Sequence, residues 1–509
     1  MCIRDSHFIA RKGLFSLALA AVGAMFLGSC AVDGFDDKEK FDNGVSGVKL
    51  ESPELALKTV VASDGSDKLQ VSWKVVYGAG GYECKAYKVD DPTNPEVIVD
   101  TIMDGTSFQF KLAEDTKYKF SVRTLGNVKQ NNTEADQATE KFYNTLVPAT
   151  TIPVDRDIAE FIKENLQNSD KEQAFELEAG ATYTCNDEVD FQGNKMTLRG
   201  NKLNHAIVIM GEKGVIRTSA QLKVKYLNFD CTAVTNKGGI VEMSTTPPAS
   251  CSAEAQGIAA GKNKNLPADV FVLQDPIILQ ECAFKNVPSC LFHIGHCAWG
   301  LADIRIDNCV VQLDNDGSKF SNGAVISFYG DTKKDFASPS GGQFWACSAQ
   351  KISVKNSTIY NIKKNSKNYF VRFANKDIDR IFPTTSGSFS LESCTLSKVM
   401  TGKDFANNMP QQKKYVINVN NNVFYDTWRI QKLNKGGCTV NCDMTTNAIQ
   451  GVTNPVDGTD LKSWATEEPI GFDDAACLKK LDLSQPDFGI NFKATGAISS
   501  TIGDPRWRK

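Results

Sequence analysis

The stretch Ile304-Arg305-Ile306-Asp307-Asn308-Cys309-Val310-Val311 decides the fold, because its pattern returns along much of the chain. The pattern is an eight-residue phrase: apolar, any, apolar, any, turn residue, small residue, any, apolar. Alternating apolar residues favour a half-buried strand, and a turn residue between two such runs favours a bend. Each phrase therefore predicts a strand, a bend and the start of a second strand.

The phrase occurs several times, and the spacing between copies is as informative as the phrase itself. The copies begin at Met196, Leu222, Ile277, Ile304, Ile352, Phe389 and Ile417. The shortest separations are about 26 to 28 residues, which suits one coil of a β-solenoid, and the longer ones indicate loops inserted into single coils. Each repeat of a solenoid buries its apolar face only against its neighbours. Residues 148–509 are therefore predicted to form an all-β solenoid.

The fifth and sixth positions of the phrase carry a family resemblance. Asparagine recurs at the fifth position, and cysteine recurs at the sixth, where a small apolar side chain is expected to stack on the next coil. This pattern resembles the coils of right-handed parallel β-helices of the pectin-lyase-like class, in which an asparagine often stacks at the bend. The fifth position holds Asn308, Asn356 and Asn421 but also Gly200, Tyr226, Glu281 and Ser393, and the sixth holds Cys282, Cys309 and Cys394 but also Ser357 and Asn422.

The two ends of the solenoid are predicted from local signals. Leu177–Tyr183 looks like the first coil of a β-helix, and a capping helix at about 155–167 is expected before it, with Asp155 as N-cap. That helix would cover the open end and block edge pairing. The closing segment at about 450–509 contains Ile502–Trp507, which resembles the end of uncharacterised β-helical surface lipoproteins of polysaccharide-utilisation systems.

Residues 48–147 predict a separate small β-sandwich. Leu69–Trp73 alternates and brings a tryptophan to the core. Leu112–Val122 resembles the L-x-x-x-T-x-Y-x-F-x-V signature of fibronectin type III domains. The resemblance implies that Tyr118 occupies a corner while Phe120 and Val122 face the core. Such modules mostly serve as spacers, and glycan binding is the alternative role.

Residues 1–29 are predicted to be a signal peptide, because Arg11 and Lys12 precede a short apolar run. Leu27-Gly28-Ser29-Cys30 resembles the lipobox of bacterial lipoproteins, which implies lipid on Cys30. The acidic tether 30–47 resembles the surface-export signal of outer-membrane lipoproteins, so a lipid-anchored protein of the outer membrane that faces the exterior is expected. Met1–Ser6 places an acid in a region that should be positive, and we interpret it as an artefact.

Composition excludes several function classes. The formal net charge of -3 argues against a nucleic-acid partner, because phosphate backbones select strongly basic surfaces. The 15 cysteines include no C-x-x-C pair, which argues against a zinc ribbon. The motifs of serine hydrolases, zinc proteases and P-loop enzymes are missing. We therefore expect neither a metal nor a cofactor.

A second short strand follows each phrase, and its polar residues define the candidate site. If the flanking apolar residues face the core, period-two alternation sends one polar residue of each strand outward, and neighbouring coils align these residues in one column. The candidate ligand-binding residues are Glu242, Ser327, Arg372 and Arg429, and His293 belongs to the same column. Arginine suits the carboxylate of an acidic sugar through its bidentate geometry.

Three functions remain open at this point. The first is binding of an extracellular, acidic polysaccharide by a surface lipoprotein, with other surface glycan-uptake proteins as further partners. The second is a metal-independent polysaccharide lyase, in which Arg372 binds the uronate while His293 and Tyr329 act as base and acid in β-elimination. The third is a structural or adhesion protein without a glycan site, since outward residues of a β-helix are often merely solvated.

Overall fold

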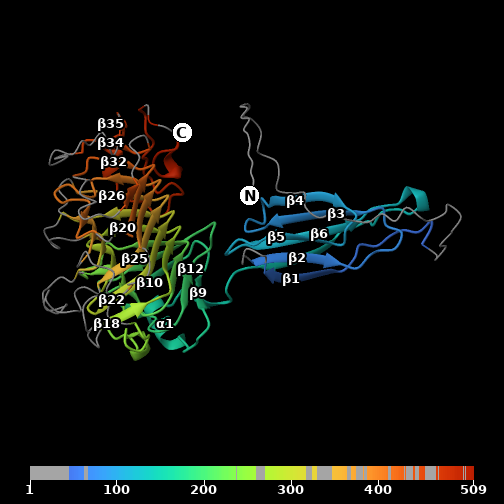
Figure 1. Ribbon diagram of the computed structural model, residues 1–509, viewed down its shortest axis with the longest axis horizontal. Helices are drawn as coiled ribbons and strands as arrows, with labels where there is room; N and C mark the ends of the chain where they lie inside the picture. Colours follow the sequence, from blue (N-terminus) through green and yellow to red (C-terminus); the bar gives the residue numbers. More distant parts are fainter. Residues whose placement is uncertain are drawn as a thin grey trace, which may run out of the picture. The chain divides into compact units, whose positions relative to one another are not determined.

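The computed structural model describes a mostly β protein with an N-terminal antiparallel part and a parallel β-helix (Figure 1). It describes residues 45–508 except 62–66, 237, 259–269, 317–323, 330–346, 364–367, 374–381, 383–386, 411–413, 429, 431–438, 442–445, 453–465, 468, 497 and 499. The predicted signal peptide, Cys30 and most of the acidic tether lie outside these residues, as does Arg429. In the described part of the chain, no helix is long and apolar enough to cross a membrane.

The antiparallel part consists of two sheets whose inner faces meet in an aromatic core. Trp73 makes an edge contact with Tyr82 of the other sheet, with 5.3 Å between the ring centroids. The ring centroids of Phe108 and Phe120 lie 6.5 Å apart. The three-stranded sheet has the order β1 (Leu55–Val61), β2 (Asp67–Trp73), β5 (Ser107–Lys111), and the four-stranded sheet has the order β4 (Glu96–Met103), β3 (Tyr82–Lys88), β6 (Lys117–Thr124), β7 (Thr139–Asn144).

The fibronectin-like signature of this sandwich behaves as the resemblance implies. Tyr118, Phe120 and Val122 are buried on alternate positions of β6. The Tyr118 hydroxyl accepts a hydrogen bond from the backbone N–H of Ala113 at 2.7 Å, which ties the strand to the turn before it. Trp73 is buried as predicted.

The β-helix is built from three parallel sheets that the chain visits in turn. The eleven-stranded sheet runs β33 (Thr439–Asn441), β31 (Val416–Asn420), β28 (Ser388–Glu392), β25 (Ser348–Lys355), β22 (Ala298–Asp307), β19 (Ile277–Gln280), β15 (Leu222–Lys225), β12 (Met196–Arg199), β9 (Gln173–Leu177), β8 (Ala149–Ile152), with β18 (Val270–Leu273) beside β22. The ten-stranded sheet runs β10 (Thr182–Cys185), β13 (Ala206–Met210), β16 (Leu227–Asp230), β20 (Ala283–Val287), β23 (Val310–Leu313), β26 (Thr358–Asn361), β29 (Thr395–Ser397), β32 (Val423–Tyr425), β34 (Ala448–Gln450), β35 (Thr466–Glu467).

The seven-stranded sheet completes most coils and carries the candidate site. It runs β11 (Glu188–Asp190), β14 (Val215–Thr218), β17 (Gly239–Met243), β21 (Cys290–His293), β24 (Ala324–Ser327), β27 (Tyr369–Arg372), β30 (Ala406–Asn407). Six of the seven phrases thus form a strand of the eleven-stranded sheet, a bend and the start of a strand of the ten-stranded sheet, which confirms the predicted solenoid; in the first copy the second strand, β13, begins only after the phrase, at Ala206.

The bend at the fifth position of the phrase is left-handed in every copy except the first, where Gly200 does not have a positive φ. Asn308, Asn356 and Asn421 are left-handed there, with φ of 53°, 50° and 59°. Glu281 and Ser393, which depart from asparagine, also have positive φ, at 51° and 56°. Asparagine tolerates this conformation better than most residues with a Cβ atom. The repeated feature is therefore the backbone turn, and asparagine is its most compatible residue.

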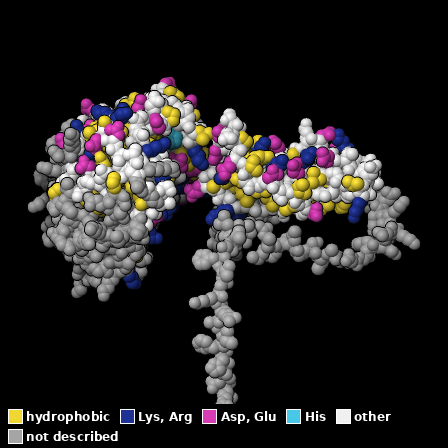
Figure 2. All heavy atoms as spheres, turned by 90° about the horizontal axis from the view of Figure 1, so that it is seen from above, with side chains coloured by type: hydrophobic (Ala, Val, Ile, Leu, Met, Phe, Trp, Pro, Cys, Tyr) yellow, Lys and Arg dark blue, Asp and Glu magenta, His cyan; other side chains and the backbone are white. Residues whose placement is uncertain are grey.

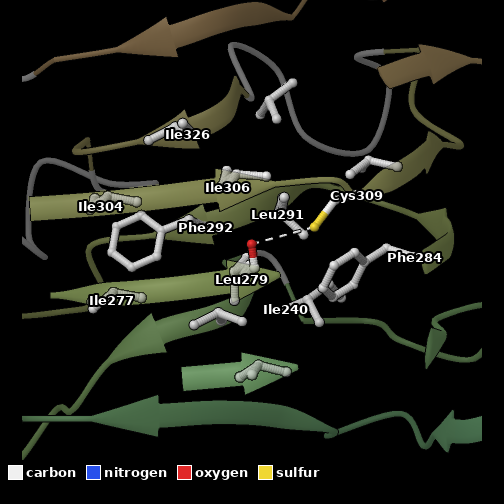
Figure 3. Close-up of a cluster of buried hydrophobic side chains, with 14 of the residues drawn as sticks. Ile240, Ile277, Leu279, Phe284, Leu291, Phe292, Ile304, Ile306, Cys309 and Ile326 are labelled. Atoms are coloured by element: carbon white, nitrogen blue, oxygen red, sulfur yellow. Dashed lines mark hydrogen bonds between the residues drawn. The ribbon is translucent and has the colours of Figure 1, made fainter. Parts of the chain in front are cut away.

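The sixth position forms a hydrogen-bonded ladder between coils rather than the apolar stack we expected. The Cys309 thiol lies within donor distance of two carbonyl oxygens, that of Asp307 in its own coil at 3.3 Å and that of Leu279 in the preceding coil at 3.5 Å, the contact drawn in Figure 3. Asn422 makes the equivalent bond to Leu391 at 2.8 Å through its side-chain amide. A buried carbonyl needs a donor, so small donors suit this position, although the buried Leu227 fills it in the phrase that begins at Leu222. We call this set the sixth-position ladder: Cys282, Cys309, Ser357, Cys394, Asn422 and Asn447. Ser357 differs from the others, because its hydroxyl donates to the Lys355 carbonyl of its own coil and accepts from the Cys309 N–H of the preceding coil.

The first coil is covered by the single α-helix of the described residues, α1 (Ile158–Asn165). Its N-cap is Asp157, which accepts from the N–H groups of Ala159 and Glu160, so the predicted cap at Asp155 is wrong. The reason is a turn just before the helix, closed by a bond from Arg156 N–H to the Pro153 carbonyl. Ile158 and Ile162 are buried in the same core cluster as Tyr183 of the first coil.

The last segment of the chain packs on the outside of the ten-stranded sheet. Trp507 donates from its indole nitrogen to the Thr358 hydroxyl at 2.7 Å, and Asp504 accepts from the same hydroxyl at 2.7 Å. Phe492 and Trp507 belong to a second hydrophobic cluster with Tyr360 of β26. The closing segment therefore covers a face of the β-helix other than the seven-stranded sheet.

Candidate functional site

The predicted column of polar residues exists on the seven-stranded sheet. Strand pairing aligns Glu242 with His293, His293 with Ser327, and Ser327 with Arg372. The alignment continues to Arg217 at one end and to Asn407 at the other. We call this set the polar column: Arg217, Glu242, His293, Ser327, Arg372 and Asn407.

Most of the column is buried, which differs from the expectation of an outward, solvated row. Glu242 is 1% exposed, Ser327 2% and His293 4%, whereas Arg372 is partly exposed. A buried charge or polar group is costly unless neighbours satisfy it, so these residues must be held by specific partners. The column is therefore a packed polar network with one partly accessible cation.

A buried ion-pair cluster forms one end of the column. The Arg217 guanidinium donates from Nε to Glu242 Oε2 at 2.9 Å, and its Nη2 lies 2.8 Å from the same oxygen. Its Nη1 pairs with Glu188. Burial lowers the pKa of Arg217, but the two carboxylates, Glu242 first, outweigh burial and raise it overall. The arginine therefore stays charged and compensates both acids.

The other oxygen of Glu242 is held by a glycine turn. Glu242 Oε1 accepts from the Gly239 N–H at 2.8 Å. A Cβ atom at Gly238 would lie 1.6 Å from that oxygen, so only glycine fits there. The local sequence Gly238-Gly239 is thus explained by the close approach of the carboxylate.

His293 is fixed in the middle of the column by its backbone surroundings. Its Nδ1 accepts from the Gly295 N–H at 3.0 Å, and its Nε2 lies 3.0 Å from the Tyr329 carbonyl oxygen. This pattern corresponds to a neutral imidazole with its proton on Nε2. Nδ1 also lies 3.6 Å from Glu242 Oε1, but the lone pair of Nδ1 is already used. The arrangement orients the ring rather than leaving a nitrogen for a substrate proton.

Tyr329 links the histidine to the exposed end of the column. Its carbonyl oxygen accepts from the Ser327 hydroxyl at 3.2 Å as well as facing His293. The Arg372 guanidinium carbon lies 3.7 Å from the centroid of the Tyr329 ring. A guanidinium stacked on an aromatic ring has reduced rotational freedom and keeps its in-plane donors directed sideways. Arg372 is therefore a preoriented cation next to Tyr329.

Sequence reasoning missed the ion-pair end of the column. Ile216-Arg217-Thr218 lies one short coil before Glu242, and the same period-two argument would have placed Arg217 beside it. His293 and Tyr329, predicted to act as base and acid, are brought together through the tyrosine backbone, whose carbonyl oxygen lies 3.0 Å from His293 Nε2. Among the described residues, no group of three or more His, Cys, Asp or Glu side chains is placed to hold a metal ion.

The strand pairing defines the class of the protein: a parallel β-helix that follows an antiparallel sandwich in the chain. Residues 3–182 match DUF4992, a domain of unknown function, and residues 181–362 match another domain of unknown function, DUF4957. No curated protein matches the chain. Among solved structures, the chain is similar to the pectate lyase PelI from Erwinia chrysanthemi in complex with tetragalacturonic acid, with 8% identity over 80% of this chain and 86% of that chain and a TM-score of 0.13. The fold assignment rests on the strand pairing.

Proposed function

We propose that the chain is a lipid-anchored protein of the outer-membrane surface that binds an extracellular, acidic polysaccharide at the exposed end of the polar column. The observation that supports this proposal is the stacking of Arg372 on Tyr329, which holds a partly exposed cation in a fixed orientation. A carboxylate is the natural partner of such a guanidinium, because two parallel N–H donors match its two oxygens. The predicted lipid on Cys30 supports the surface location, and Arg429 remains a predicted second contact.

Binding is favoured over catalysis by the partners of His293. A lyase needs a base whose lone pair reaches the proton beside the uronate carboxylate. In His293 both ring nitrogens face backbone groups, Gly295 and Tyr329. The buried carboxylate of Glu242 is neutralised by Arg217, so it does not supply a substitute base.

The test is a binding measurement on the full chain with polygalacturonate and alginate. We expect binding without turnover, weakening as salt rises from about 0.05 M to about 0.5 M, because exposed charge interactions are screened. Arg372→Ala should weaken binding about tenfold or more, since a hydrogen bond to a charged group contributes about 1.5–3 kcal/mol. The affinity of Arg372→Lys should lie between those of the native protein and of Arg372→Ala, because lysine keeps the charge but loses the bidentate geometry.

The matched control is Arg305→Ala, which removes an exposed arginine from the eleven-stranded sheet instead. Arg305 pairs with Asp303 on the same strand, and its side chain is 53% exposed. Equal weakening by both substitutions would contradict a specific site. Ultraviolet-absorbing unsaturated products from either polymer would establish the lyase alternative, and a lack of binding to both polymers would leave the structural role.

A further inference from the structure

A pocket at one end of the sandwich is a separate feature that the polar column does not explain. It lies among three loops, which follow β2, β4 and β6, and has a volume of about 470 Å³. Small-molecule sites commonly have volumes of about 300–1,000 Å³. The volume of this pocket therefore falls within the range of small-molecule sites.

Glycines make this hollow a built feature of the fold. A Cβ atom at Gly80 would lie 2.1 Å from the Gly126 carbonyl oxygen, so the two loops meet backbone to backbone. Gly80 N–H donates to the Leu125 carbonyl at 3.0 Å, and Leu125 N–H donates to the Gly81 carbonyl at 2.9 Å. Side chains are thereby kept out of the floor of the pocket.

The walls are fixed by buried polar contacts. The Tyr82 hydroxyl accepts from the Val76 N–H at 2.8 Å, which anchors the loop after β2. The Asn132 amide donates to the Gly78 carbonyl at 3.0 Å, and Asn132 is buried. The Asn127 side chain caps the short 3₁₀ helix η1 (Val128–Gln130). The pocket is therefore preformed, which lowers the entropic cost of binding.

The rim of the pocket carries both apolar and polar side chains, and its apolar side chains are exposed instead of being packed in the core of the sandwich. Val128 is 96% exposed and Val75 is 59% exposed, although both line the pocket. Hydrophobic side chains also reach the surface of the sandwich among charged ones on the face seen in Figure 2. Asp104 and Lys129 add one negative and one positive charge to the lining, together with the amide of Asn127.

We infer that this pocket binds one or two residues of an uncharged glycan. A sugar ring presents apolar C–H groups on its faces and hydroxyls at its edges, which match valines beside hydroxyl-binding side chains. The two opposite charges cancel, so the pocket has no excess charge to select an anionic sugar. This site is independent of the proposed binding of acidic polymers by Arg372, and the two sites differ in the sugars they select.

The experiment measures binding of neutral hexasaccharides to the full chain by calorimetry. The probes are α-1,4-glucan, β-1,4-glucan, β-1,4-xylan and β-1,4-mannan hexamers, with hexagalacturonate for comparison. At least one neutral hexamer should bind, and the double variant Val128→Ser/Asp104→Ala should weaken it at least tenfold. Both side chains are exposed, so the substitutions leave the core intact.

Two controls make the outcomes separable. Val61→Ser removes a valine that is 73% exposed. Val61 pairs with the start of β2, whereas the pocket lies beyond the end of β2, so the substitution should leave binding unchanged. Arg372→Ala should also leave neutral binding unchanged. The inference fails if no neutral hexamer binds, if the double variant still binds, or if the pocket variant loses hexagalacturonate instead. If hexagalacturonate binds through Arg372 and no neutral hexamer binds, the proposed function is supported and this inference is removed.

Discussion

The sixth-position ladder and the polar column are both rows of side chains with one member in each coil, but they follow opposite rules. In the ladder, Cys309 and Asn422 make the same bond to the carbonyl of the preceding coil, although one is a thiol and the other an amide. In the column, Arg217, Glu242 and His293 are in register, and each has different partners. When a row repeats similar hydrogen bonds, its residues meet a need of the coil backbone. When each residue of a row has different partners, the residues are matched individually to their neighbours.

This difference predicts where substitutions are tolerated. A ladder member can be replaced by another small donor, because the backbone carbonyl that it serves is the same in every coil. A column member cannot be replaced by its neighbour's residue type, because the buried charge of Glu242 is balanced by Arg217, whose Nη2 lies 2.8 Å from Glu242 Oε2. The following predictions test this contrast, beginning with the largest effect.

Glu242→Ala should destabilise the β-helix by about 3–5 kcal/mol, the usual cost of removing one partner of a buried ion pair. The substitution leaves Arg217 buried with Glu188 alone and leaves the Gly239 N–H without its carboxylate acceptor. Urea unfolding followed by circular dichroism measures the change.

The control for this prediction is Glu392→Ala, which breaks the 3.0 Å pair with Lys355 on the eleven-stranded sheet. Both of these side chains are about a third exposed or more, so the loss should stay within about 1 kcal/mol. Similar losses in the two variants would mean that the polar column is not a compensated network.

Asn422→Ala should destabilise by about 2 kcal/mol, because it leaves two buried backbone groups without partners. The Asn422 amide donates to the Leu391 carbonyl, and its side-chain oxygen accepts from the Cys394 N–H at 2.9 Å. Asn422→Ser should lose less, since a hydroxyl can both donate and accept. Unfolding experiments in urea measure both, and equal losses would contradict the hydrogen-bonded role of the ladder.

The sequence predicted the repeat well because each coil must meet the same geometric demand. The phrase located the strands beside Ile304 and Ile352, and the period-two argument placed Glu242, His293 and Ser327 in one column, as strand pairing confirms. Their roles in binding or catalysis stay predictions.

Three features could not be predicted from the phrase. The first is the burial of Glu242: the period-two argument can place Arg217 beside it, but alternation alone does not show that the pair is covered from solvent. The ladder member Asn447 follows the short strand β33 (Thr439–Asn441), so its coil does not show the full phrase. The loop pocket of the sandwich depends on the approach of Gly80 to Gly126, residues that are distant in the chain.

Glu281→Asn should stabilise the β-helix by about 0.5–1 kcal/mol. Glu281 has a φ of 51° at the fifth position of the phrase, where Asn308 has 53° in the next coil. The left-handed conformation costs most residues about 1–2 kcal/mol, and asparagine is among those that adopt it most readily. The reverse substitution, Asn308→Glu, should destabilise by a similar amount. Thermal unfolding of the two variants checks the direction of each change in stability. If both variants were less stable than the native protein, the contacts of the two side chains, and not the backbone conformation, would determine the residue at this bend.

Cys394→Ser should change the stability least, by about 0.5 kcal/mol or less, which is the range of substitutions that keep all partners. The Cys394 thiol lies 3.3 Å from the Glu392 carbonyl of its own coil and 3.5 Å from the Val354 carbonyl of the preceding coil, and the serine at the equivalent position 357 donates to the carbonyl of its own coil. Burial raises the pKa of the Cys394 thiol, so the native protein holds it as a neutral donor, which a hydroxyl can replace. Cys394→Val, with similar bulk but no donor, should cost about 1–3 kcal/mol by leaving the Val354 carbonyl unsatisfied. If valine were tolerated better than serine in urea unfolding, the row would be an apolar stack, and its contrast with the polar column would disappear.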